Sequence, residues 1–225
     1  MHSENGIIEQ RYTVAHLAAT INQPCLLELI CRFLYDQVYP DSDIPSTYVS
    51  LNACPVFLGM VSVFSSAKAT YFAPSDDSGI GGMHWEHIHA VPSWRNGPPR
   101  YDCAFVNSHP DLSGMRGLDV VHILLFFSIT SGGVVYPCAL VHWFSCIHEE
   151  RDEDTGMWMV QPELDDGMPV TTVIHLDCIF RAAHLIPIYG NAVVPATISH
   201  HNSLDAFAAF YVNKYADHHA FEIAS

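Results

Sequence analysis

The feature that most constrains the fold of this chain is a pair of long apolar segments separated by a short glycine-containing turn. Residues 118–129 (LDVVHILLFFSI) and 134–144 (VVYPCALVHWF) are rich in the β-branched and aromatic residues that favour strands. Residues 130–133 (TSGG) between them have the composition of a hairpin turn. The chain is therefore expected to contain an antiparallel β core built around this hairpin.

Shorter segments with the same β character surround the hairpin, and residues 74–79 (PSDDSG) form a clear loop between two of them. These segments are 56–63, 68–73, 100–106, 157–161 and 170–176. Consecutive short strands favour an α+β, β-rich fold with an antiparallel, partly open barrel. The barrel is expected to run from about Val56 to Tyr189, and to be of the general kind seen in SH3-like and BAH-like modules.

Helices are predicted on both sides of the barrel. Apolar residues at helical spacing predict a first helix with Pro24 in its first turn and its end at Pro40. A C-terminal helix is predicted to start at Ser203, a suitable N-cap residue. Its apolar face would consist of Leu204, Phe207, Tyr211 and Tyr215. Residues 1–22 are expected to be poorly ordered, and residues 23–225 to form a single β-rich domain.

Charge and cysteine content exclude several function classes. The formal net charge is −15, and the nine lysines and arginines are scattered singly along the chain. Binding of duplex DNA needs clustered basic residues, so direct duplex binding is not expected. The apolar runs are too short to cross a bilayer. Seven irregularly spaced cysteines without a CxxC pair indicate reduced thiols and an intracellular protein.

Residues 147–167 form the most acidic stretch of the chain. Arg151 is the single cation among eight acids. These acids are Glu149, Glu150, Asp152, Glu153, Asp154, Glu163, Asp165 and Asp166. We expect a protruding acidic hairpin that carries the short strand at 157–161. Trp158, between the two acidic runs, and Trp143, in the second long strand, are candidate aromatic anchors for a protein partner, although a position within a strand is equally consistent with Trp143 being a core residue.

Several motifs of the chain resemble the C-terminal region of Plavaka-type transposon proteins, fungal members of the CACTA (En/Spm) group. The motifs lie at 71–76 (YFAPSD), 136–144 (YPCALVHWF), 154–158 (DTGMW), 174–177 (IHLD), 181–190 (RAAHLIPIYG) and 210–219 (FYVNKYADHH). The resemblance covers roughly residues 25–225. It implies that the catalytic carboxylates of the transposase lie upstream of the matched region. It also implies an accessory role inside the cell, in the nucleus.

The tightest cluster of candidate metal ligands is residues 84–89 (HWEHIH). His84, Glu86, His87 and His89 could together ligate zinc, because imidazole and carboxylate groups are its usual ligands. No HExxH motif or paired CxxC accompanies the cluster. The alternative interpretation is a polar loop edge beside two tryptophans.

Two further polar groups occur in the matched C-terminal region. Arg181 is expected to pair with Asp177 or a backbone carbonyl, in a single helical turn at 178–183 that is followed by a strand. Alternatively, Arg181 and His184 form a recognition pocket. Residues 217–219 (DHH) are expected at the exposed C-terminal end of the last helix, where histidine interacts favourably with the helix dipole.

Arrangements typical of catalysis are not found in the sequence. Cys178, His175 and Asp177 share one short segment, whereas a nucleophilic triad draws its members from separate elements. The acids at 152–154 and 165–166 lie in one stretch, and the order of elements is not that of an RNase H-like transposase core.

The sequence therefore predicts a non-catalytic accessory module of a transposon-derived protein, with no cofactor. Its partner would be a protein, either within a transposase assembly or a basic chromatin protein attracted by the acidic surface. The alternative is a metal-dependent nuclease or hydrolase that uses the cluster at 84–89, with zinc as its metal. A third alternative is a decayed transposon fragment without a present function.

Overall fold

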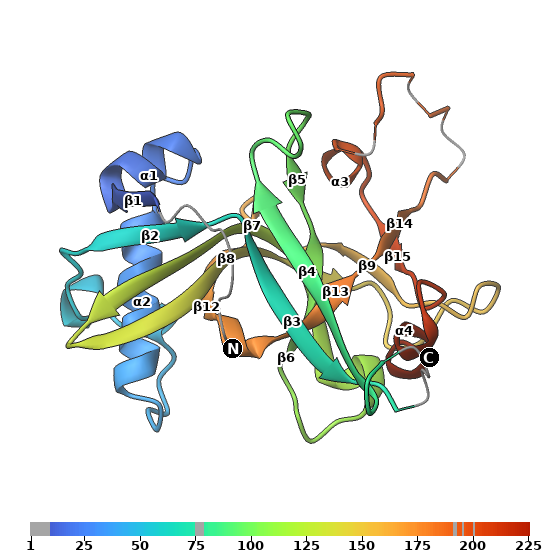
Figure 1. The fold of residues 1–225 in the computed structure, drawn as a ribbon, viewed down its shortest axis with the longest axis horizontal. Helices are drawn as coiled ribbons and strands as arrows, with labels where there is room; N and C mark the ends of the chain where they lie inside the picture. Colours follow the sequence, from blue (N-terminus) through green and yellow to red (C-terminus); the bar gives the residue numbers. More distant parts are fainter. Residues whose placement is uncertain (1–9, 75–78, 191–192, 195, 200) are drawn as a thin grey trace.

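The computed structural model describes residues 10–74, 79–190, 193–194, 196–199 and 201–225. The predicted hairpin lies at the centre of the fold, where strand β7 (Leu118–Ser131) pairs with strand β8 (Val134–Cys146) (Figure 1). Gly132 and Gly133 form the turn with φ values of 59° and 82°. Glycine adopts this left-handed backbone without the steric penalty of a side chain, so the turn closes with only two residues.

Each of the two long strands pairs with different neighbours at its two ends. β7 pairs with β2 (Met60–Phe64) near the turn and with β6 (Cys103–Asn107) at its start. β8 pairs with β12 (Thr171–His175) in its middle and with β9 (Met159–Pro162) at its end. A β-bulge between Ile123 and Leu125 shifts the register of the hairpin between these regions. The sheet consequently curls into an open antiparallel half-barrel, as the sequence predicted.

Further strands extend this main sheet at its edges. β1 (Gln10–Thr13) pairs with β2, and β13 (Ile179–Ala183) pairs with β6. β15 (Phe210–Val212) joins β9 to β14 (Leu185–Pro187). The predicted helical turn at 178–183 is wrong, because β13 occupies these residues after the short 3-10 helix η4 (Leu176–Cys178).

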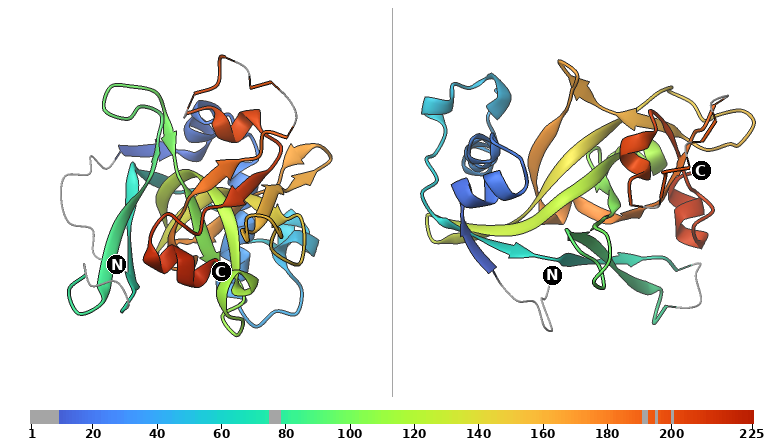
Figure 2. Two further views of the ribbon diagram at one scale, coloured as in Figure 1. Left: turned by 90° about the vertical axis from the view of Figure 1, so that its right-hand side faces the viewer. Right: turned by 90° about the horizontal axis from the view of Figure 1, so that it is seen from above.

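A smaller antiparallel sheet packs beside the main sheet (Figure 2). It consists of β3 (Ser66–Phe72), β4 (Met83–Val91) and β5 (Arg100–Tyr101). The alternating side chains of Ala67, Ala69, Ile88 and Ala90 are buried against the main sheet. The hairpin of β10 (Leu164–Asp165) and β11 (Met168–Pro169) is separate from these two sheets, and the 3-10 helix η3 (Gly114–Gly117) directly precedes β7.

Two helices cover one end of the main sheet. α1 (Val14–Thr20) begins after Thr13, whose side chain accepts a hydrogen bond from the backbone N–H of His16. α2 (Leu26–Val38) agrees with the predicted first helix and buries Leu26, Ile30 and Leu34 completely. The connection to β2 contains 3-10 helices η1 (Ser46–Tyr48) and η2 (Leu51–Ala53).

The expectation of disorder at 1–22 is wrong for residues 10–20, which form β1 and α1. The physical reason is that Val14 and Leu17 pack into the apolar core beneath α2. Residues 1–9 lie outside the described part of the chain.

The C-terminal region is divided into short elements instead of forming one long helix. α3 (Ser203–Ala206) has four residues and α4 (His218–Ile223) has six, and β15 lies between them. Phe210 and Val212 are fully buried in the sheet, and this packing requires an extended backbone where a helix was predicted. Helices therefore flank the half-barrel at both ends, as expected, but the second is interrupted (Figure 1). In the described part of the chain, no helix has the length and apolar composition needed to cross a membrane.

Candidate functional site

The most site-like feature of the molecule is a groove made of two adjoining cavities that share Tyr101. The first, which we call the Trp94 cavity, has a volume of about 500 Å³ and lies between β5, β7 and α3. The second, the Tyr12 cavity, has a volume of about 770 Å³ and lies between β1, α1, β2 and the β7–β8 hairpin. Both volumes fall within the range of roughly 300–1,000 Å³ that is usual for ligand sites.

Two histidines connect these cavities across the central hairpin. His122 on β7 lines the Trp94 cavity, and His142 on β8 lines the Tyr12 cavity. The two residues are direct cross-strand partners, and their ring centroids are 6.4 Å apart. The ring of Tyr101 meets that of His122 edge to face at 6.2 Å. The groove therefore has two imidazoles and one phenol at its base.

The environment keeps both imidazoles neutral. The pKa of His122 is lowered to about 4, first by burial and then by the neighbouring His142, whereas Asp205 opposes the shift. Burial also lowers the pKa of His142, and Asp205 again acts in the opposite direction. His122 hydrogen-bonds a backbone group of Tyr101, but its Nε2 atom is buried without a partner among the described residues. A neutral histidine with one bonded nitrogen presents the other as a hydrogen-bond acceptor.

The rim of the Trp94 cavity carries a compact ion-pair network. Arg100 donates to both carboxylate oxygens of Asp102, at 2.8 and 3.1 Å. Asp102 also accepts from the backbone N–H of His89 at 2.8 Å, and its Oδ2 lies 3.2 Å from the Nδ1 atom of His89. The indole of Trp94 packs on His89 at 4.2 Å and on Arg100 at 5.0 Å. The charge of Arg100 is thus compensated within the rim.

The predicted zinc site at 84–89 is not formed. These residues form part of β4 rather than a loop edge, and side chains alternate between the two faces of a strand. Glu86 lies on the inner face, where Oε1 accepts a hydrogen bond from the backbone N–H of Ala182 at 2.6 Å. His87 and His89 lie on the outer face with Trp85. In the described part of the chain, no group of three or more His, Cys, Asp or Glu residues is placed to hold a metal ion.

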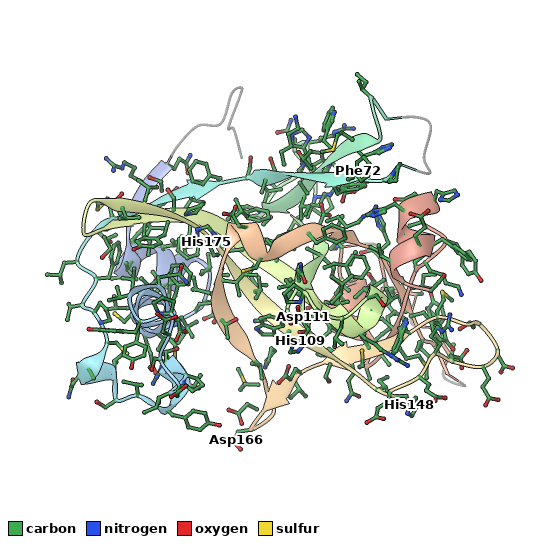
Figure 3. All side chains as sticks on the ribbon, turned by 90° about the horizontal axis from the view of Figure 1, so that it is seen from below. Phe72, His109, Asp111, His148, Asp166 and His175 are labelled. Atoms are coloured by element: carbon green, nitrogen blue, oxygen red, sulfur yellow. The ribbon has the colours of Figure 1, made fainter. Side chains whose placement is uncertain are left out.

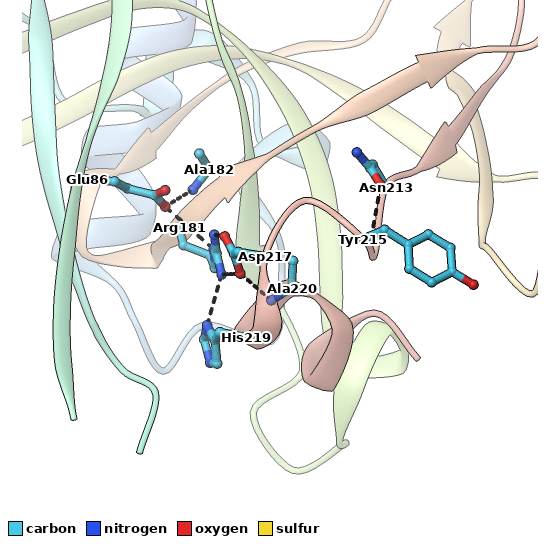
Figure 4. Close-up of polar contacts among 8 residues, drawn as sticks. All are labelled: Glu86, Arg181, Ala182, Asn213, Tyr215, Asp217, His219 and Ala220. Atoms are coloured by element: carbon cyan, nitrogen blue, oxygen red, sulfur yellow. Dashed lines mark hydrogen bonds and ion pairs between the residues drawn. The ribbon is translucent and has the colours of Figure 1, made fainter. Parts of the chain in front are cut away.

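Arg181 lies at the centre of a buried polar cluster and not in an open recognition pocket (Figure 4). Its side chain is 0% exposed, and Nη1 donates to Oδ1 of Asp217 at 3.0 Å. Its Nη2 atom donates to Oδ2 of the same carboxylate, and Nε lies 3.6 Å from Glu86. The expected pairing with Asp177 is wrong. His184 is exposed, whereas Arg181 is buried.

Aromatic and helix-capping contacts complete the cluster. The guanidinium of Arg181 lies 4.5 Å from the ring centroid of Tyr71, which stacks on His219 at 4.8 Å. Asp217 caps the start of α4 and accepts a hydrogen bond from the backbone N–H of Ala220 at 2.7 Å. Burial alone would raise the pKa of Asp217, but the hydrogen bonds from Arg181 and Ala220 hold it at about 2. Within the cluster, Nη1 and Nη2 of Arg181 are hydrogen-bonded, whereas its buried Nε atom has no hydrogen-bond partner among the described residues and lies 3.6 Å from Glu86.

The motif at 217–219 consequently starts a helix, whereas the sequence suggested an exposed helix end. His219 is buried beside Arg181 and Tyr71, and burial lowers its pKa, as does the charge of Arg181. His218 is exposed and lies 3.6 Å from Glu222 on the same helix.

The acidic loop, residues 147–154, is solvent-exposed at most of its carboxylates. Glu149, Glu150, Glu153 and Asp154 are exposed and line a shallow hollow of about 600 Å³. Asp152 is different, because it accepts hydrogen bonds from the backbone and side chain of Thr155 at 2.9 and 2.7 Å.

The second acidic run lies apart from this loop, on the β10–β11 hairpin. Asp165 and Asp166 are exposed there, and Figure 3 places Asp166 and His148 at separate points of the periphery.

Neither predicted aromatic anchor is free for a partner. Trp158 is 8% exposed and packs in a core cluster with Phe144 and Phe210. Trp143 is half-buried, and its Nε1 atom donates to Oγ1 of Thr172 at 2.6 Å. These side chains are covered by residues that are distant in the sequence, and the presence of a tryptophan does not by itself predict such packing.

The short segment around Cys178 has no nucleophilic arrangement. The Nδ1 atom of His175 accepts a hydrogen bond from the backbone N–H of Asp177 at 3.2 Å. Burial and the charge of Asp177 raise the pKa of the Cys178 thiol, which is the opposite of activation.

Comparisons of the chain with protein-family models, curated protein sequences and solved structures found no match. What the molecule does is therefore inferred from its own geometry.

Proposed function

We propose that this chain is a non-catalytic binding module whose acidic loop contacts a basic protein partner. The single observation that carries the proposal is the exposure of Glu149, Glu150, Glu153 and Asp154 around one hollow. Exposed carboxylates of one sign speed the encounter with a basic segment and favour its orientation, while adding little to the stability of the fold.

The remaining polar chemistry of the molecule supports a binding role over a catalytic one. The carboxylates of Asp102 and Asp217 are each engaged by an arginine. Partners of the kind implied by the resemblance to Plavaka-type proteins are other proteins of a transposase assembly or basic chromatin proteins in the nucleus. Their lysine- and arginine-rich segments have the charge that the acidic loop would attract.

Charge reversal tests the proposal. The variant carries Glu149→Lys, Glu150→Lys and Glu153→Lys, and retains Asp152 because that residue holds the Thr155 turn. Association with a lysine- and arginine-rich peptide, such as a histone tail, is measured at two salt concentrations. We expect the association rate of the variant to fall by about tenfold or more at low salt, and the difference to shrink as salt rises.

A matched control separates local from overall charge. Asp41→Lys, Asp43→Lys and Asp177→Lys make the same change in net charge at exposed positions outside the acidic loop. The control should bind the peptide nearly as the original protein does. Equal losses in both variants, or no loss in the first, would contradict a binding role for the acidic loop.

A further inference from the structure

The Tyr12 cavity has a volume of about 770 Å³ and no charged side chain in its wall. No aspartate, glutamate, lysine or arginine of the described part of the chain lines it, although the whole chain has a formal net charge of −15. The Trp94 cavity, in contrast, is lined by Arg100, Asp102 and Asp205. Moving an ion out of water into a site without a counter-charge is costly. The Tyr12 cavity therefore favours an uncharged occupant.

Much of the wall of this cavity is apolar surface that is still partly open to solvent. Tyr12, Val63 and Leu124 pack on the edge of the core beneath α2. Phe64 and Tyr101 pack on the edge of the core beneath the smaller sheet. All five side chains are only partly buried, so the cavity is a hollow between two cores. A hydrocarbon placed there would remove this apolar surface from water, which favours binding.

Two side chains in the wall have hydrogen-bonding groups that the fold does not use. The imidazole of His142 and the phenol of Tyr101 form no hydrogen bond in the described part of the chain. Both side chains are partly exposed, and their polar atoms are reached by solvent, unlike Nε2 of His122. A neutral imidazole offers one donor and one acceptor, and so does a phenol. Both groups therefore match a hydroxyl, which is itself a donor and an acceptor.

From this arrangement we propose that the Tyr12 cavity binds an uncharged small molecule that is mostly hydrocarbon and carries a hydroxyl group. The hydrocarbon packs on Tyr12, Phe64 and Leu124, and the hydroxyl exchanges hydrogen bonds with His142 and Tyr101. An aromatic and an aliphatic alcohol share this chemistry. The site is separate from the acidic loop and goes beyond the proposed function.

A matched series of probes separates the effects of charge and of the hydroxyl. The series is p-isopropylphenol, p-cymene, p-isopropylbenzoate and p-isopropylbenzylammonium, which share one apolar body, and n-octanol is added as the aliphatic alcohol. Binding is followed by amide chemical shifts of the isotope-labelled full chain near neutral pH. We expect p-isopropylphenol to bind about fivefold more tightly than p-cymene, which has a methyl group in place of the hydroxyl. The two ions should bind at least about tenfold more weakly than p-isopropylphenol.

Variants locate the hydroxyl. Tyr101→Phe and His142→Phe remove the hydrogen-bonding groups and keep rings of similar size. Each should reduce the preference for p-isopropylphenol over p-cymene, and the double variant should abolish it without weakening the binding of p-cymene. Tyr48→Phe removes the hydroxyl of a tyrosine that is 83% exposed outside the cavity, and should leave the preference unchanged.

The outcomes decide the proposal and the type of alcohol. Binding of either alcohol with shift changes around Leu124 and Tyr101 supports the site, and the tighter alcohol shows whether the ligand is aromatic or aliphatic. No binding by either alcohol, or an ion that binds as tightly as p-isopropylphenol, would overturn the proposal. So would equal affinity for p-isopropylphenol and p-cymene, or a preference that is unchanged in both single variants. Because Tyr101→Phe removes only one oxygen atom, the test remains decisive even if a change at His142 prevents folding.

Discussion

Arg181 and Asp217 are 36 residues apart in sequence, and the guanidinium of one donates to both carboxylate oxygens of the other. The pair joins β13 of the main sheet to the first residue before α4. Since Arg181 is fully buried, the position of the C-terminal helix depends on neutralising this charge.

Replacement of Asp217 by Asn should therefore destabilise the fold. The change leaves Arg181 with Glu86 as its remaining anion, at 3.6 Å, while the amide oxygen of Asn can still accept the capping hydrogen bond from Ala220. We expect a loss of about 3 kcal/mol in the free energy of unfolding, measured by denaturant titration. As a control, Glu222→Gln disrupts the exposed pair with His218 and should cost less than about 0.5 kcal/mol. A cost for Asp217→Asn as small as the control's would mean that the buried pair contributes little.

Acid should destabilise the protein through His122. The pKa of this residue is about 4 in the folded chain and 6.5 in its ordinary state, so the unfolded chain binds the proton first as pH falls. Stability is then lost progressively from pH 6.5 down to about pH 4. Asp217, with a pKa of about 2 instead of 3.8, contributes a separate loss below this window.

The variant His122→Phe isolates the contribution of His122. Unfolding free energies of the variant should depend less on pH between about 6.5 and 4 than those of the original chain. His148→Phe alters an exposed histidine and should leave the pH dependence as it was. If the two variants gave the same curve, burial of His122 would not be the source of the acid sensitivity.

The central hairpin and the first helix could be predicted from sequence because both depend on local signals. Gly132 and Gly133 mark the turn, and the apolar spacing from Leu26 to Leu34 marks the helix. Strand β4 was missed because three histidines and Glu86 interrupt it. Strand β4 forms because it pairs with β3 along the whole length of β3, and this pairing cannot be predicted from the amino-acid composition of β4.

The pairing of His122 with His142 in the groove could not be predicted from the sequence, because it depends on a single β-bulge in the central hairpin. In the register that starts at the turn, Ser131 faces Val134, and an unbroken hairpin would place Trp143 opposite His122. The bulge after Ile123 moves His142 to that position instead. Bulges leave no clear signal in a segment as uniformly apolar as β7.

Trp158 should act as a core residue and not as a binding residue. It is 8% exposed, so Trp158→Ala is expected to cost about 3–5 kcal/mol in the free energy of unfolding. Trp158→Phe should cost much less and should leave peptide binding to the acidic loop unchanged. Trp85, which is 60% exposed, offers a control: its change to Ala should cost about 1 kcal/mol or less, including its contact with Lys68. Weaker peptide binding in a fully folded Trp158→Phe protein would restore the role of this residue as an anchor.

Proteolysis should first cut the acidic loop without separating the two parts of the chain. Glu149, Glu150 and Glu153 are exposed between β8 and β9, so a glutamate-specific protease should cleave there before other sites. The fragments should stay together on a native gel, because β9 and β12 follow the cut and both pair with β8, which precedes it. Unfolding of the nicked protein should remain one cooperative transition, followed by circular dichroism. Isolation of a separately folded fragment that ends near Phe144 would contradict the prediction that residues 23–225 form a single domain.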